Sequence, residues 1–535
     1  MDWFHDKQHD VLIYPARYTP NPTYLPEARP INGSWFGIKR TLRNCQILRF
    51  LNFPVPFIIT DENYDWPIER GRKPLAHQKV MANFMVLNPR SFNLSDMGTM
   101  KTLSTLWAAD WMMRQHPPGT YRALIVAPLS TLERVWANAI FRNFMSNRSF
   151  EILHGNEDAR RKGLAKKADF SIINFDGVGV GAHVRKKFEL DGFSRELSER
   201  SDIKMVIVDE CSAYKDATTK RHRLARLILG KRECLWMLTG TPTPNAPTDA
   251  YGLAKLVNNA FGKSFSTFQS ESMIKITQFK WKPLADGYEK ARRLLTPSIR
   301  YDLADVWDGP EITTQQREVG LSPAQKKMMA DLKRDLVVQA KTGHLISAPN
   351  EAAARQKFIQ ISLGAIYDEN HKAHLIDAGP RIEELRSLLE QASGKVLIFS
   401  PLTSVVHLLH KTLMKTAHWT CEIVNGETSP KERNRIFESF QQSPTSEPRI
   451  LIADPGTMAH GLDLWQARTV IWYGPSDKTE LYLQANRRAY RPGQTHPVTV
   501  VQIVSNALER EIYRRLESNT SLQGALLDMV KTGQL

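Results

Sequence analysis

Short apolar runs rich in Ile and Val recur in the first half of the chain, separated by segments of helical periodicity. These runs occupy residues 123–127, 170–173, 205–208 and 235–238. Strands of a parallel sheet are buried on both faces and are joined by helical crossovers, so this alternation predicts a parallel sheet covered by helices. We therefore expect an α/β lobe over residues 73–250.

The same pattern returns in the second half, at residues 395–400, 450–453, 469–473 and 498–503. These runs predict a second α/β lobe over residues 377–520. Residues 251–376 lack such runs and instead contain helical stretches, among them 323–340 and 351–363, with many Lys and Arg. The predicted fold class is α/β, with two parallel-sheet lobes in tandem and a helical insertion between them.

The two ends of the chain carry no chemical motif. Residues 1–72 are rich in Pro, Asn and aromatic side chains and contain one strand-like run, at 55–60, and we treat them as an N-terminal accessory region. Residues 521–535 form a C-terminal tail. Neither a basic-then-apolar leader nor about 18 consecutive apolar residues occurs. We expect a cytoplasmic protein, of a prokaryotic cell or a virus-infected host, that is not secreted and makes no membrane contact.

The charge balance favours a polyanionic partner. The 535 residues include 72 Lys and Arg against 56 Asp and Glu, a formal net charge of +16. An excess of this size is typical of proteins that bind nucleic acid, although it also occurs on surfaces that are simply solvated. The four cysteines form no CxxC pair, which argues against a structural metal.

A candidate phosphate loop lies at residues 93–102, NLSDMGTMKT, directly before a helical segment. Phosphate binding requires backbone N–H groups at a helix N-terminus, a Lys for charge and a hydroxyl for magnesium. Gly98, Lys101 and Thr102 stand where those roles require. The pattern GxxxxGK[ST] has Gly where this chain has Ser95 and Met100, and a motif this short also matches ordinary helix starts.

A pair of carboxylates follows an apolar strand at residues 204–210, KMVIVDE. Ligands of parallel sheets bind at the carboxyl ends of the strands, so Asp209 could hold magnesium through water. Glu210 could then orient the attacking water toward a γ-phosphate. Taken alone, the motif also fits a strand that ends in solvent.

With residues 238–245, LTGTPTPN, the chain resembles the Swi/Snf branch of the superfamily-two helicases. Residues 74–78, PLAHQ, resemble that family's adenine-sensing motif, and residues 127–136, APLSTLERVW, its next motif. In the second half the similar segments are KVLIFSP, VNGETSPKER, HGLDLWQARTVIWYGPS and QANRRAYRPGQ, in the family's order. The resemblance covers roughly residues 73–520. The box that follows the strand reads DECS, so Cys211 and Ser212 replace the usual Ala and His.

The resemblance implies two RecA-like lobes and a set of site residues. The implied ATP-binding residues are Gln78, Asp96, Met97, Gly98, Thr99, Met100, Lys101, Thr102, Gly461 and Asp463. Arg488 and Arg491 would act as arginine fingers beside the catalytic Lys101, Asp209 and Glu210. The residues implied to couple nucleotide state to movement are Thr239, Gly240, Thr241 and Gln484. Candidate contacts to a nucleic-acid strand are Ser130, Thr131, Asn174 and Thr403.

The motifs predict a nucleic-acid-stimulated ATPase that uses ATP and magnesium, with Thr102 and Asp209 as the magnesium-binding residues. The resemblance to the Swi/Snf branch implies that it moves mainly on duplex DNA. One alternative is an ATP-dependent helicase that unwinds RNA or acts on single strands. Another is a clamp that retains the fold without hydrolysing ATP, because Met100 and the DECS box depart from the pattern. Two basic clusters, at residues 160–167 and 220–226, could support the duplex or could be solvated surface.

Overall fold

The structure is a computed structural model that describes residues 3–21, 23–184, 188–276, 281–341, 348–368, 370, 372–415, 419–458 and 463–518. The chain divides into two compact units. The first comprises Met1–Thr243, Pro247–Ile274 and Lys282–Val306, and the second Pro244–Ala246, Lys275–Trp281 and Trp307–Leu535. Among the described residues, no helix combines the length and apolar character needed to cross a bilayer.

The first unit is built on a seven-stranded sheet in the order β15-β5-β12-β11-β6-β8-β7. Every strand pair in it is parallel, which confirms the predicted fold class. Its strands are β5 (Arg90–Asn93), β6 (Arg122–Ala127), β7 (Phe150–Leu153), β8 (Phe170–Asn174), β11 (Ile203–Val208), β12 (Cys234–Leu238) and β15 (Ser298–Ile299).

Helices connect these strands, and both faces of the sheet are buried. The α-helices are α2 (Ala76–Leu87), α3 (Lys101–Arg114), α4 (Asn138–Phe144), α5 (Glu157–Ala165), α6 (Gly192–Glu199), α7 (Lys220–Ile228), α8 (Asp249–Val257), α9 (Phe265–Ser272), α10 (Gly287–Leu294) and α11 (Leu303–Val306). Along β11, Met205 and Ile207 enter one apolar cluster while Val206 and Val208 enter another. Side chains of a strand alternate between faces, so an uninterrupted apolar run supplies two cores at once.

Residues 3–72, expected as an N-terminal accessory region, are grouped with the first unit. They form an antiparallel sheet in the order β1-β2-β4-β3, made of β1 (Phe4–Asp6), β2 (Val11–Pro15), β3 (Arg29–Asn32) and β4 (Trp35–Lys39), followed by α1 (Leu42–Phe50). The apolar run at 55–60, expected as a strand, is irregular. Its Ile59 instead exchanges two hydrogen bonds with the side chain of Asn83 on α2, at 2.8 and 2.9 Å, which satisfies the buried backbone without a partner strand.

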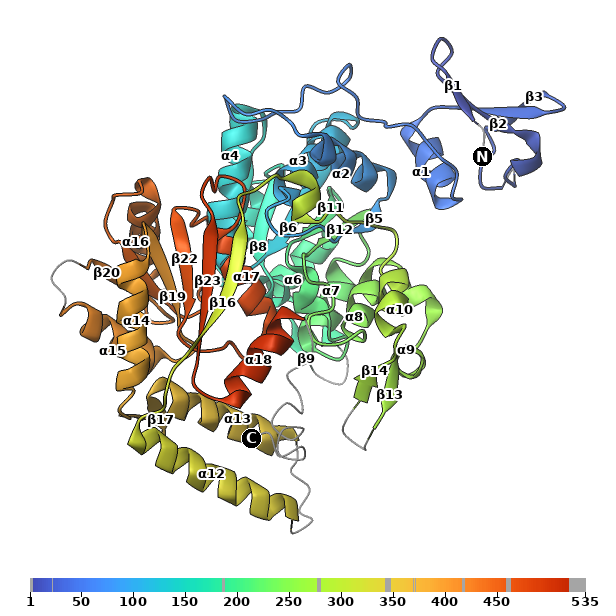
Figure 1. Cartoon of the computed structure of the whole chain (residues 1–535). Coiled ribbons are helices and arrows are strands. Elements are labelled where there is room, and N and C mark those ends of the chain that lie inside the picture. Colours follow the sequence, from blue (N-terminus) through green and yellow to red (C-terminus); the bar gives the residue numbers. More distant parts are fainter. Residues whose placement is uncertain are drawn as a thin grey trace. The chain divides into compact units, whose positions relative to one another are not determined.

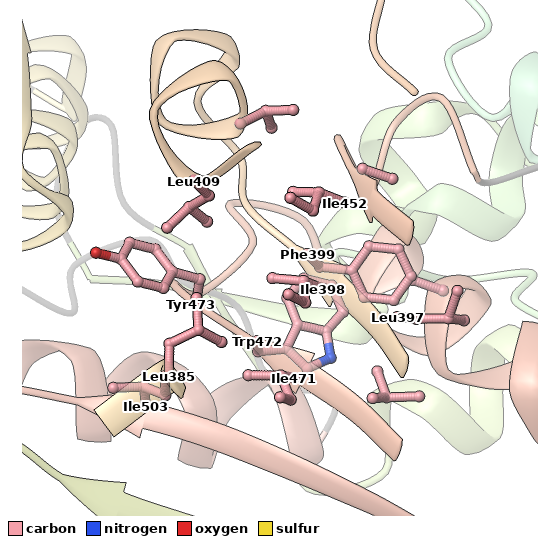
Figure 2. Close-up of a cluster of buried hydrophobic side chains, with 14 of the residues drawn as sticks. Leu385, Leu397, Ile398, Phe399, Leu409, Ile452, Ile471, Trp472, Tyr473 and Ile503 are labelled. Atoms are coloured by element: carbon pink, nitrogen blue, oxygen red, sulfur yellow. The ribbon is translucent and has the colours of Figure 1, made fainter. Parts of the chain in front are cut away.

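The second unit contains a six-stranded parallel sheet in the order β16-β23-β22-β19-β21-β20. Its strands are β16 (Ile312–Glu318), β19 (Lys395–Phe399), β20 (Cys421–Val424), β21 (Ile450–Ala453), β22 (Ala467–Trp472) and β23 (Val498–Val504). Its helices are α12 (Pro323–Lys341), α13 (Ala348–Leu363), α14 (Gly379–Gln391), α15 (Thr403–Leu413), α16 (Pro430–Gln442), α17 (Thr479–Ala489) and α18 (Ala507–Glu517). Figure 2 shows the core between sheet and helices, with Phe399 of β19 and Trp472 of β22 near Leu409 of α15.

The region expected as a helical insertion, 251–376, is divided between the two units. Its helical stretches are present as α12 and α13, whose Met329 and Phe358 join the second unit's core. However, β15 pairs with β5 in the first sheet, and β16 runs beside β23 at the edge of the second (Figure 1). The polar residues of β16 are mostly exposed, so this edge strand lacks the apolar run that marks a buried one. The described residues also form three two-stranded sheets, which consist of β9 (His183–Val184) and β10 (Phe188–Glu189), β13 (Met273–Lys275) and β14 (Trp281–Pro283), and β17 (Ala365–Tyr367) and β18 (Ala373–Leu375).

Candidate nucleotide-binding site

The predicted phosphate loop connects the end of β5 at Asn93 to the start of α3 at Lys101. The first backbone N–H groups of a helix have no partner within it, so this start is suited to phosphate oxygens. Met100 adopts φ 59° and ψ 37°, a left-handed conformation that glycine adopts readily. A Met in this conformation therefore carries a backbone cost of about 1–2 kcal/mol that Gly would not.

Lys101 folds back onto the loop. Its Nζ donates to the carbonyl oxygens of Ser95, at 2.5 Å, and Asp96, at 2.9 Å. Burial lowers the pKa of the Lys101 ammonium, and the nearby carboxylates of Glu210 and Asp209 oppose that shift. The structure thus brings together the lysine and both carboxylates that the sequence predicted, from α3 and from the end of β11.

The two carboxylates are held in different ways. Asp209 accepts a hydrogen bond from the indole Nε1 of Trp136, at 2.9 Å, and another from the backbone N of Glu210, at 3.1 Å. Glu210 itself takes a left-handed backbone conformation, φ 48°, and accepts from the hydroxyl of Thr239 at 3.4 Å. Strained backbone of this kind in a non-glycine residue is found preferentially at functional sites.

Gln78 lies in the first turn of α2 with 1% of its surface exposed. Its Oε1 accepts from the backbone N of Leu75 at 3.0 Å. Its Nε2 is buried and has no hydrogen-bond partner among the described residues. A buried amide donor is costly to leave unpaired, so it fits a ligand acceptor such as the adenine ring. The neighbouring His77 connects α2 to the loop through the Thr99 carbonyl, at 3.2 Å.

The predicted coupling segment packs directly against the phosphate loop. Thr239 donates its backbone N–H to the carbonyl of Asn93 at 3.1 Å, and its hydroxyl accepts from the backbone N of Thr241 at 3.1 Å. A Cβ on Gly240 would lie 3.3 Å from the backbone N of Met97. Glycine at position 240 therefore permits this close approach between the two segments.

In the second unit, the predicted residues lie near the end of α17. Arg488 is buried, and Arg491 forms an ion pair with Asp463, whose side chain is 58% exposed. Gln484 is fully buried and donates to Glu480 at 3.1 Å. Gly461 lies outside the described residues. The pairing of Arg491 with Asp463 places two predicted site residues together within this unit.

The candidate nucleic-acid contacts follow the carboxyl ends of strands, but not all are exposed. Ser130 is exposed after β6, and Thr403 begins α15 with a half-buried side chain. The Thr131 side chain is buried, and its hydroxyl donates to the Pro128 carbonyl at 2.8 Å. Asn174 accepts two hydrogen bonds from Arg160, each 3.3 Å. Thr131 thus stabilises its own turn and Asn174 binds a side chain of α5, and their contact with a nucleic-acid strand stays a prediction.

The basic clusters are partly used within the protein. Arg160 is buried and also donates to the carbonyl of Leu153 at 2.6 Å, while Lys166 pairs with Glu151 at 2.8 Å. In the other cluster, Arg221 pairs with Asp176 at 2.7 Å. The described residues contain no group of three or more His, Cys, Asp or Glu side chains that could together hold a metal ion. The cysteines at 45, 211, 234 and 421 are buried thiols.

Several residues of the site were not predicted. Trp136 lies within the segment resembling a family motif, but its bond to Asp209 is not readable from the motif. The backbone of Asp96 donates to the carbonyl of Tyr301 at 2.9 Å, and the Asp96 side chain faces Arg300 and Leu303. Asp96 and Arg300 are 204 positions apart in the sequence. No local sequence pattern indicates that residues so far apart form a contact.

Comparison with known families agrees with this geometry. The model described as the SNF2-related domain matches residues 77–362, and that of the helicase conserved C-terminal domain matches residues 380–493. The chain belongs to the SNF2-related family of helicase-like ATPases, the Swi/Snf branch of the superfamily-two helicases.

Individual relatives are distant. The chain is 25% identical over 462 residues to the ISWI chromatin-remodeling complex ATPase CHR11 of Arabidopsis thaliana, covering 81% of this chain and 40% of that protein. It is 24% identical to the putative ATP-dependent helicase/translocase YwqA of Bacillus subtilis, covering 81% of this chain and 46% of that protein. Putative protein p41 of Acyrthosiphon pisum secondary endosymbiont phage 1 is 23% identical, covering 86% of this chain and 98% of that protein. The chain thus spans less than half the length of the plant and bacterial relatives.

Among solved structures, the Sulfolobus solfataricus SWI2/SNF2 ATPase core in complex with dsDNA matches with 20% identity and a TM-score of 0.40. The match covers 88% of this chain and 95% of that one.

Proposed function

We propose that this chain is an ATP-dependent motor that hydrolyses ATP while moving along duplex DNA. The observation that carries the proposal is the grouping of Lys101, Asp209 and Glu210 around one loop at the carboxyl edge of the first sheet. Membership of the SNF2-related family supports it. The names of the relatives, which include ATPase and helicase/translocase, agree with such an activity.

In this proposal the nucleotide is bound by groups that the fold positions in advance. The amides at the start of α3 bind phosphate oxygens, and Lys101 exchanges its two carbonyl acceptors for a phosphate. A hydroxyl from Thr102 and a carboxylate from Asp209 suit magnesium, which takes its remaining ligands from phosphates and water. Glu210 orients the attacking water. Gln78 donates its buried Nε2 to the base.

The second unit contributes the charge that completes the reaction. Arg488 and Arg491 act as arginine fingers, because a guanidinium stays charged and donates a planar fork to phosphate oxygens. Nucleotide-dependent closure then moves one lobe relative to the other along a strand. The net charge of +16 favours a polyanionic track, and contacts at Ser130, Thr131, Asn174 and Thr403 would be independent of base sequence.

The direct test is ATP hydrolysis by the full chain with duplex DNA, single-stranded DNA, RNA or no polymer. We expect the greatest stimulation with duplex DNA, and its loss in Lys101→Ala and Glu210→Gln. Lys290→Ala is the matched control. Lys290 lies on α10 of the same unit and pairs with Asp286 at 2.7 Å, outside the candidate site. Greater stimulation by RNA would favour the alternative of an ATP-dependent helicase that unwinds RNA. Absence of turnover despite nucleotide and DNA binding would favour the clamp.

Movement is tested separately from hydrolysis. Displacement of a third strand from a triplex, without release of strands from forked DNA, is the expected result for a duplex translocase. Efficient release from the fork would contradict the proposal of translocation with little strand separation.

A further inference from the structure

The stretch 299–303, near the end of the first unit, is hydrogen-bonded to residues 94–96 of the phosphate loop. The backbone N–H of Leu94 donates to the carbonyl of Ile299 at 2.8 Å, and that of Asp96 to the carbonyl of Tyr301 at 2.9 Å. In return, the backbone N–H of Tyr301 donates to the hydroxyl of Ser95 at 3.1 Å. These bonds extend the short pairing of β15 with β5 beyond the end of both strands.

The Asp96 side chain faces the same stretch. One carboxylate oxygen lies 3.4 Å from Nη2 of Arg300, and the other accepts from the backbone N of Leu303, also at 3.4 Å. Leu303 is the first residue of α11, so this oxygen meets the positive end of a helical turn. The Asp96 carboxylate thus faces a guanidinium and a backbone N–H group, both of which attract negative charge. The negative charge of a triphosphate would repel it. Its partners thus fit a positioning role better than the nucleotide contact that the resemblance implies.

Ser95 and Asp96 also hold the lysine. Their carbonyl oxygens are the two acceptors of Lys101 Nζ, while their other polar groups are bonded to Tyr301 and Leu303. When Lys101 turns to a phosphate, the loop loses both lysine contacts. The contacts to residues 299–303 then remain to keep the loop in place, and they reduce the free energy needed to reorganise it.

Residues 299–303 also lie just before the point at which the chain leaves the first unit. Helix α11 ends at Val306, and residues from Trp307 onward belong to the second unit. We propose that Asp96 is a positioning residue that ties the phosphate loop to this connection, so that nucleotide binding and the order of residues 301–306 are coupled. The inference rests on the proposed nucleotide site. Because such coupling is reciprocal, nucleotide shifts the equilibrium between the ordered and less ordered states of residues 301–306 by the factor by which these two states differ in nucleotide affinity.

The test combines nucleotide affinity with amide hydrogen exchange in the full chain. The probe is a fluorescent ATP analogue with magnesium, and the variants are Asp96→Ala and Asp96→Asn. In the wild type, nucleotide should increase protection of the amides at 301–306. Asp96→Ala should weaken nucleotide binding about three- to tenfold, as expected for the loss of one hydrogen bond, and should abolish the protection change. Asp96→Asn keeps an acceptor for Leu303 and should lie between.

Arg292→Ala is the matched control, since Arg292 is an exposed arginine that pairs with Glu289 at 2.7 Å in the same unit. It should leave both measurements unchanged. A wild type that binds nucleotide without any change at 301–306 overturns this inference alone. So does an Asp96→Ala variant that keeps the wild-type affinity and protection change. A wild type that binds no nucleotide overturns the proposed function as well.

Discussion

The indole Nε1 of Trp136 donates a hydrogen bond to Oδ2 of Asp209 at 2.9 Å, across 73 positions of the sequence. Trp136 is fully buried, whereas Asp209 is partly exposed. Together with the bond from the backbone N of Glu210 to Oδ1, the indole bond constrains the orientation of the Asp209 carboxylate. An orienting bond of this kind commonly determines how well a carboxylate serves a metal ion.

Trp136→Phe should therefore lower the rate of ATP hydrolysis about ten- to a hundredfold, because a hydrogen bond to a charged group contributes about 1.5–3 kcal/mol. An aromatic side chain is retained, and the loss of volume on going from indole to phenyl is the same in the control variant Trp236→Phe. The measurement is kcat for DNA-stimulated hydrolysis with its dependence on magnesium concentration. Trp236→Phe is the control, because Trp236 is equally buried and its indole donates to the carbonyl of Met85 at 3.0 Å, which is not part of the site. Equal effects in both variants would contradict the role of Trp136.

Much of the fold follows from the apolar runs, because the central strands are buried on both faces. The strands β6, β11 and β12, for example, coincide with three of these runs and lie in the middle of the first sheet. The strands that the pattern missed include all four edges, β15, β7, β16 and β20. An edge strand such as β16 keeps polar residues on its exposed positions, so its sequence reads like a loop.

The candidate site shows the same division. Lys101, Asp209 and Glu210 were predictable, because each stands at a position where a parallel sheet presents its ligands. The bonds from Trp136 to Asp209 and from Tyr301 to the phosphate loop were not. An indole N–H and backbone groups occur throughout any sequence, and only the fold determines which of them meet.

Met100 provides a second prediction, which concerns the backbone. It holds φ 59° with 37% of its surface exposed. Met100→Gly should bind the fluorescent ATP analogue at least as well as the wild type, because glycine adopts this conformation without strain. Met100→Val should bind about fivefold more weakly, since left-handed conformations cost an L-residue about 1–2 kcal/mol and disfavour β-branched side chains most. Equal affinity of the Gly and Val variants would show that the left-handed conformation does not matter for binding.

Lys395 provides a prediction about pH. Its ammonium is buried in the second unit and donates to the carbonyl of Phe440 at 2.5 Å and to the hydroxyl of Ser446 at 2.8 Å. Burial lowers its pKa from 10.5 to about 8. Between these values the unfolded chain binds a proton that the folded chain has released, so this group makes the protein more stable as pH rises. Below pH 8 the cost of burying the charge is present in full.

Lys395→Met removes this titration. The free energy of unfolding of the wild type should increase relative to that of the variant as pH rises from 7 to 10, measured by chemical denaturation in parallel. Comparing the two proteins cancels the titration of other groups. A constant difference across this pH range would mean that the folded and unfolded chains bind the Lys395 proton equally well.

The last prediction concerns the attachment of the N-terminal residues to the first unit. The hydroxyl of Tyr64 donates to Asp110 at 2.7 Å, and Asp110, which is 1% exposed, lies on α3, the helix that follows the phosphate loop. Arg148 pairs with the same carboxylate at 2.6 Å. Tyr64→Phe should destabilise the first unit by about 1–3 kcal/mol, because a buried charged group loses one of its donors. Tyr24→Phe, at an exposed position of the same N-terminal region, should change the free energy of unfolding little. If denaturation monitored by tryptophan fluorescence gives the same value for both variants, the N-terminal residues are not held through Asp110.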